Sequence, residues 1–111
     1  MNEQYTINFI GVSTAQAGRY AENLKHAIQN IDPNLQVERK RARNDTQDLG
    51  ASLLLVLGTA SASAIAKGIA RWIAKNGGAR IEISANGTVV ASNLESGDAA
   101  KIAAAFSPRN K

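Results

Sequence analysis

The first part of the chain alternates between apolar and polar positions in a pattern that predicts a strand, a helix and a second strand. Residues 5–9 alternate strictly, as in a half-buried strand. Ser13 and Gln16 have the spacing of a capping box, and an apolar stripe of helical period then runs to Ile31. Residues 35–39 alternate again. This order predicts a right-handed β-α-β unit with its two strands parallel.

The longest uncharged stretch of the chain lies between Asp48 and Lys67. We interpret residues 49–75 as one helix, about 40 Å long at about 1.5 Å per residue. Five consecutive large apolar residues begin at Leu53 and would cover every side of a helix. This half is therefore expected to be buried all round, or to face a partner or lipid. A small residue recurs every four positions from Gly58 onward, which lets another backbone approach closely.

The third part of the chain carries a hairpin signal. Asn86 and Gly87 stand between two alternating runs at 79–84 and 88–91, and Asn-Gly in that setting favours a type I′ turn. A short amphipathic helix ending near Phe106 follows. The predicted order is β-α-β-α-β-β-α. We expect an α+β fold with a four-stranded mixed sheet, a long central apolar helix and two shorter helices.

Length and composition indicate one domain over residues 1–111. Hydrophobic residues make up 44% of the chain but aromatic residues only 5%, so the core is expected to be mainly aliphatic. A basic loop is predicted at 40–47 and a frayed tail at 107–111.

The residues that usually carry catalysis are scarce. The chain has no cysteine and one histidine, His26, which we interpret as a boundary residue of the first helix. No Gly-x-Ser-x-Gly motif or phosphate-binding loop is present. Asp45 and Asp48 have no further ligand beside them at metal-binding spacing. We therefore expect no enzyme activity, no cofactor and no metal.

Positive charge gathers in two places on a chain of net charge +4. One is a patch at the start of the basic loop, made by Arg39, Lys40, Arg41 and Arg43, and the other is the tail, with Arg109 and Lys111. On the long helix, Lys67, Arg71 and Lys75 are expected to line the outer side, where they suit the C-terminal end of the helix dipole. The patch suits phosphate, an anionic membrane or an acidic protein, although most such patches are solvated surface. It has no interleaved aromatic residues, which disfavours a single-strand nucleic-acid platform.

Residues 48–90 resemble the effector-associated constant component family, which consists of small proteins of bacterial conflict systems. The resemblance rests on small and apolar segments around one tryptophan and on the hairpin that follows: Asp48-Leu-Gly50, Val56-Leu-Gly58, Ala64-Ile-Ala66, Ala70-Arg-Trp72 and residues 81–90. It implies a non-enzymatic, invariant member of a defence module that works beside a variable effector protein.

These observations lead to one main functional hypothesis. The chain is expected to be an interaction or assembly component of an antiviral defence system that self-associates or docks an effector through the long helix. The expected contact face comprises Leu53, Leu54, Leu57, Gly58, Ala62, Ala66 and Trp72.

Two alternatives stay open at this stage. In one, the same helix inserts into a membrane, although residues 49–66 span only about 27 Å against a bilayer core of about 30 Å. In the other, the basic patch binds nucleic acid. The N-terminal residues lack the basic region and apolar run of a signal peptide. We therefore expect a cytoplasmic protein, with membrane association only in an assembled state.

Overall fold

The computed structural model describes residues 3–40, 52–57, 62–76, 79–85 and 88–106. The predicted basic loop beyond Lys40, the turn at 86–87 and the tail at 107–111 lie outside the described residues.

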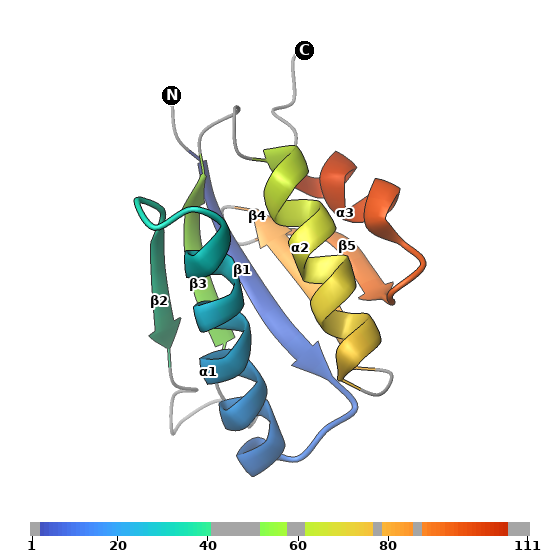
Figure 1. Cartoon of the computed structure of the whole chain (residues 1–111). Helices are drawn as coiled ribbons and strands as arrows, with labels where there is room; N and C mark the ends of the chain where they lie inside the picture. The colour runs from blue at the N-terminus through green and yellow to red at the C-terminus, as the bar shows by residue number, and fades with distance from the viewer. Residues whose placement is uncertain (1–2, 41–51, 58–61, 77–78, 86–87, 107–111) are drawn as a thin grey trace.

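The described residues form a two-layer α+β structure, as predicted for the fold class. Five strands make one sheet in the order β2-β3-β1-β4-β5, and every neighbouring pair is antiparallel. Three helices lie on the same face of this sheet (Figure 1). The strands are β1 (Glu3–Ile10), β2 (Gln36–Lys40), β3 (Ser52–Leu57), β4 (Arg80–Ala85) and β5 (Thr88–Leu94). The helices are α1 (Thr14–Ile31), α2 (Ala62–Lys75) and α3 (Ala99–Phe106).

The first six elements follow the β-α-β-β-α-β order of ferredoxin-like folds. Strand β3 lies between β1 and β2 and is antiparallel to both, so β1 and β2 point the same way without pairing. The predicted four-stranded mixed sheet is therefore wrong in two respects, since the sheet has a fifth strand and its pairs are all antiparallel. The predicted hairpin is confirmed, because β4 pairs antiparallel with β5 and Ala85 lies opposite Thr88.

The predicted long helix is wrong, because Ser52–Leu57 is a strand. Leu53 and Leu55 are fully buried under the helices and lie opposite Ile7 and Tyr5 of β1. Leu54 is half-buried and points to the other face of the sheet, as the alternation of a strand requires. An apolar run of this length suits a buried strand as well as a helix. Pairing with β1 and β2 satisfies its backbone on both sides.

The start of α1 follows the predicted cap. Ser13 has an extended backbone, and its Oγ accepts a hydrogen bond of 3.1 Å from the amide of Gln16. The return bond of a full capping box is not among the hydrogen bonds of the described residues, since the Gln16 Oε1 accepts from Arg19 instead.

Aromatic side chains tie the two layers together. Phe9 of β1, Tyr20 of α1 and Trp72 of α2 form one cluster, with ring centroids 5.2 to 5.9 Å apart. At the far end, Tyr5 packs edge-on against Phe106 and its hydroxyl donates a 3.0 Å hydrogen bond to the Phe106 carbonyl. The core is otherwise aliphatic, as the composition predicts.

Candidate docking surface

Helix α2 presents a row of cations on its outer side. Its apolar residues Ile65, Ile69 and Ile73 are buried against the sheet and the neighbouring helices. Lys67, Arg71 and Lys75 recur every four residues on the opposite side, and all three are exposed. We call these three residues the α2 stripe. The row follows from an amphipathic helix whose polar positions are occupied by bases, as its sequence spacing indicates.

Charge is unevenly divided between the two layers. The strands carry three acidic and three basic residues, whereas the helices carry six basic residues and one acidic residue. That acidic residue, Glu22, already has partners: Arg39 Nη1 donates to it at 3.3 Å, and His26 Nε2 lies 3.0 Å from its other oxygen. Among the described residues, no ion pair involves the α2 stripe. Asp32 and Asp98 flank α1 and α3, and Asp98 lies 3.8 Å from Lys101. The excess positive charge of the helical layer is therefore concentrated on the α2 stripe.

A groove of about 490 Å³ runs between α1 and α2 beside the α2 stripe. Helix α1 contributes Asn23, His26, Asn30 and Ile31 to its lining. Helix α2 contributes Gly68, Arg71, Trp72 and Lys75. The groove thus combines polar and cationic walls with an apolar strip, and none of the described residues that line it is a carboxylate. We call it the interhelical groove.

At one point along the groove, α1 and α2 approach each other closely. A Cβ atom built on Gly68 would overlap with Cδ1 of Ile31. Ile31 is nevertheless 40% exposed, which leaves much of its side chain open to the groove.

Trp72 is a buried residue that lines the groove. The residue is 6% exposed, and its ring packs edge-on against Tyr20. In the described part of the chain, its Nε1 is the one buried side-chain nitrogen or oxygen without a hydrogen-bond partner. A buried donor without an acceptor lowers stability, so Trp72 differs in this respect from the other buried residues of the described chain.

The four predicted contact residues whose side chains the structure describes do not share one exposed face. Leu53 is buried in β3, while Leu54 lies on the opposite face of the sheet. Ala66 and Trp72 are buried in α2. The side chains of the other three predicted contact residues lie outside the described residues, namely Leu57, Gly58 and Ala62. The four described residues lie apart because Ser52–Leu57 is a strand and α2 is a separate helix.

The predicted basic patch is only partly described. Arg39 is exposed on edge strand β2 and pairs with Glu22, and Lys40 ends the same strand. Arg41 and Arg43 lie outside the described residues. The row of exposed cations that the structure describes is the α2 stripe, and the sequence shows its four-residue spacing.

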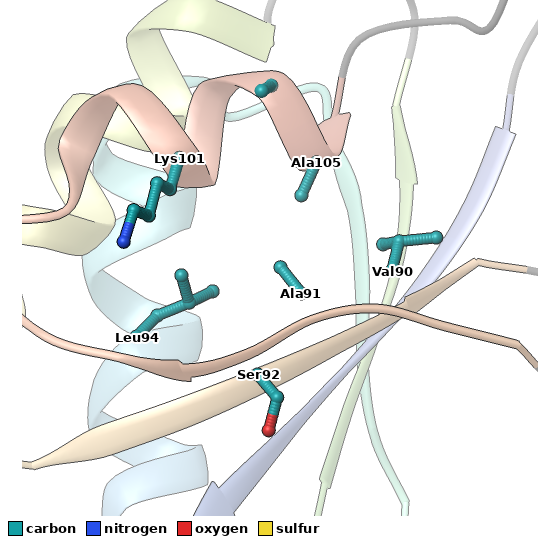
Figure 2. Close-up of a pocket in the computed structure, with 7 residues that line it drawn as sticks. Val90, Ala91, Ser92, Leu94, Lys101 and Ala105 are labelled. Carbon is teal, nitrogen blue, oxygen red and sulfur yellow. The ribbon is translucent and has the colours of Figure 1, made fainter.

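A second pocket, of about 340 Å³, lies between β5 and α3. In Figure 2, Lys101 and Ala105 of α3 face Ala91 and Leu94 of β5 across it, whereas Ser92 points away from α3. Small side chains open this space, and Lys101 is the one charged residue among the described residues that line it. These lining residues include no acid–base pair for catalysis.

Within the described residues, no group of three or more potential ligands is placed to hold a metal ion. In the same part of the chain, none of the helices combines the length and apolar character needed to cross a bilayer.

The chain was compared with protein-family models, with curated proteins and with solved structures, and no match was found.

Proposed function

We propose that this chain is a non-catalytic docking domain that binds an acidic protein surface through its helical layer. The observation that carries the proposal is the separation of charge between the layers, with the α2 stripe lacking ion-pair partners among the described residues. A surface of one sign attracts a partner of the other and speeds their encounter.

The physical role of the stripe is steering and orientation. Exposed ion pairs contribute about 0.5 kcal/mol each, so three of them supply about 1.5 kcal/mol. The rest of the affinity must come from apolar burial, for which the interhelical groove lies directly beside the stripe.

Several observations favour a protein partner over a nucleic acid. Single-stranded nucleic acids are bound by exposed aromatic rings on which the bases stack. Here Tyr5, Phe9, Trp72 and Phe106 are buried between the layers, and Tyr20 is half-buried. The open face of the sheet, where a ferredoxin-like RNA-binding module places its aromatic residues, has no aromatic side chain in the described strands.

The resemblance of residues 48–90 to the effector-associated constant component family supports an effector protein of a bacterial conflict system as the partner. The proposal keeps the expected role of an interaction component but moves the contact surface to the helical layer. The membrane-insertion alternative depended on a helix over 49–66, and residues 52–57 form a strand instead.

The proposal is tested by fluorescence anisotropy with labelled poly-L-glutamate and a labelled DNA duplex as probes. The test variant changes Lys67, Arg71 and Lys75 together to glutamine. The matched control removes the same number of cations from the strands by changing Arg39, Lys40 and Arg80 to glutamine.

We expect the protein to bind poly-L-glutamate, and the stripe variant to bind it at least about tenfold more weakly, as about 1.5 kcal/mol implies. The strand variant should lose much less of its affinity for poly-L-glutamate. Equal losses in both variants would overturn the proposal, as would stripe-dependent binding of DNA that is tighter than binding of poly-L-glutamate at the same salt concentration. Light scattering on the same samples tests self-association. If the protein forms an oligomer, and only the stripe substitutions dissociate it, the partner of the α2 stripe is a second copy of the chain and not an acidic protein.

A further inference from the structure

We infer that the interhelical groove receives one face of an acidic amphipathic helix of the partner. In this arrangement an apolar side chain of the partner covers Ile31 and Gly68, and carboxylates of the partner bind Arg71 and Lys75. The inference rests on the proposed function and assigns to it a binding mode.

The apolar part of the groove is incomplete without an occupant. Among the described residues, only Ile31 and Val89 are large apolar side chains with high exposure, at 40% and 51%. Val89 lies on strand β5, whereas Ile31 lines the groove beside the backbone of Gly68. The tip of Ile31 fills the space over Gly68, so the two residues together form an apolar strip that one side chain of a partner can cover.

The two cations of the groove determine which charge the occupant must carry and how far apart its charged groups must lie. Arg71 and Lys75 both line the groove, and they are one helical turn apart on α2. Carboxylates four residues apart on a partner helix repeat at about 6 Å, which matches this spacing. The opposite wall offers the polar groups of Asn23, His26 and Asn30. The part of the lining that the structure describes has no carboxylate to repel an acidic occupant.

The groove also contains its own reporter. Trp72 is the single tryptophan of the chain and lines the groove. A helix seated there changes the surroundings of the indole ring, while a ligand held only by the outer ends of the α2 stripe does not.

The probes are two synthetic peptides of identical composition and without tryptophan. One is an acidic helix with leucine and glutamate residues arranged on one face, and the other has the same residues scrambled. Binding is followed by anisotropy of a label on the peptide, and occupation of the groove by Trp72 emission.

Two pairs of variants separate the groove from general charge. Ile31→Ala is compared with Val89→Ala, since these are the two exposed large apolar residues of the described chain. Arg71→Gln is compared with Lys67→Gln, since both belong to the α2 stripe but only Arg71 lines the groove. Circular dichroism of each variant establishes that it is folded.

We expect the amphipathic peptide to shift Trp72 emission and the scrambled peptide to leave it unchanged. Ile31→Ala should weaken binding of the amphipathic peptide at least about fivefold, as for an interface anchor, and Val89→Ala should have no effect. Arg71→Gln should weaken binding more than Lys67→Gln.

Binding seen by anisotropy without a change in Trp72 emission, or equal effects within each pair of variants, would overturn the groove inference and leave the proposed function standing. Failure of both peptides and of poly-L-glutamate to bind would overturn the proposed function itself.

Discussion

Gly68 of α2 lies against the tip of Ile31 of α1, with no room between them for a Cβ atom at position 68. The contact sets how closely the two helices approach and gives the interhelical groove its apolar strip. Glycine inside a helix is costly relative to alanine by about 1 kcal/mol, so its presence here reflects this close approach.

Gly68→Ala should therefore depend on the residue at position 31. In the native background, the gain in helix propensity is offset by displacement of the Ile31 side chain, so we expect little or no gain in the free energy of unfolding. In an Ile31→Ala background the same change should stabilise the protein by about 0.5 to 1 kcal/mol. Urea unfolding of the four proteins gives the coupling energy. Additive effects would show that the two residues do not restrict each other.

The buried hydrogen bond from Tyr5 to Phe106 should hold α3 on the sheet. Tyr5→Phe keeps the ring contact and removes the donor of this 3.0 Å bond, so we expect a loss of about 1 to 1.5 kcal/mol in the free energy of unfolding. Tyr20→Phe is the control, since the Tyr20 hydroxyl makes a longer bond of 3.4 Å to the Asn76 carbonyl at a half-buried position. It should cost less than about 0.5 kcal/mol. Chemical denaturation measures both, and equal costs would contradict the assigned role of Tyr5.

The assignment of residues 52–57 to a strand predicts unequal effects at adjacent positions. Leu53→Ala removes a fully buried side chain and should cost about 2 to 5 kcal/mol. Leu54→Ala affects a half-buried side chain on the open face of the sheet and should cost no more than about half as much. Thermal unfolding of the two variants measures the difference. A helix buried on all sides would show similar losses at both positions, and that result would contradict the strand.

Local signals in the sequence predicted the elements that depend on neighbouring residues. The Ser13 cap, the apolar stripe of α1 and the alternating strands of the β4–β5 hairpin act within a few residues of one another, and the structure has all three. The α2 stripe was also visible, because its three cations recur at the helical period.

Strand β3 was not predicted, because its identity depends on partners that are distant in the sequence. Residues 53–57 are all apolar, a pattern that both a buried helix and a buried strand satisfy. Their backbone groups pair with β1 and β2, which precede them in the chain. Hydrogen bonding to β1 and β2 therefore decides that this segment is a strand, and the residues of the segment alone do not indicate that pairing.

The sequence by itself determined the fold class, the cap, the hairpin, the scarcity of catalytic groups and the row of cations on α2. The tertiary structure decided the strand order, the assignment of 52–57 and the contact between Ile31 and Gly68. Local patterns record which face of an element is apolar, but not which other element covers it. The groove arises where two helices distant in sequence approach each other, so it becomes visible only once the chain is folded.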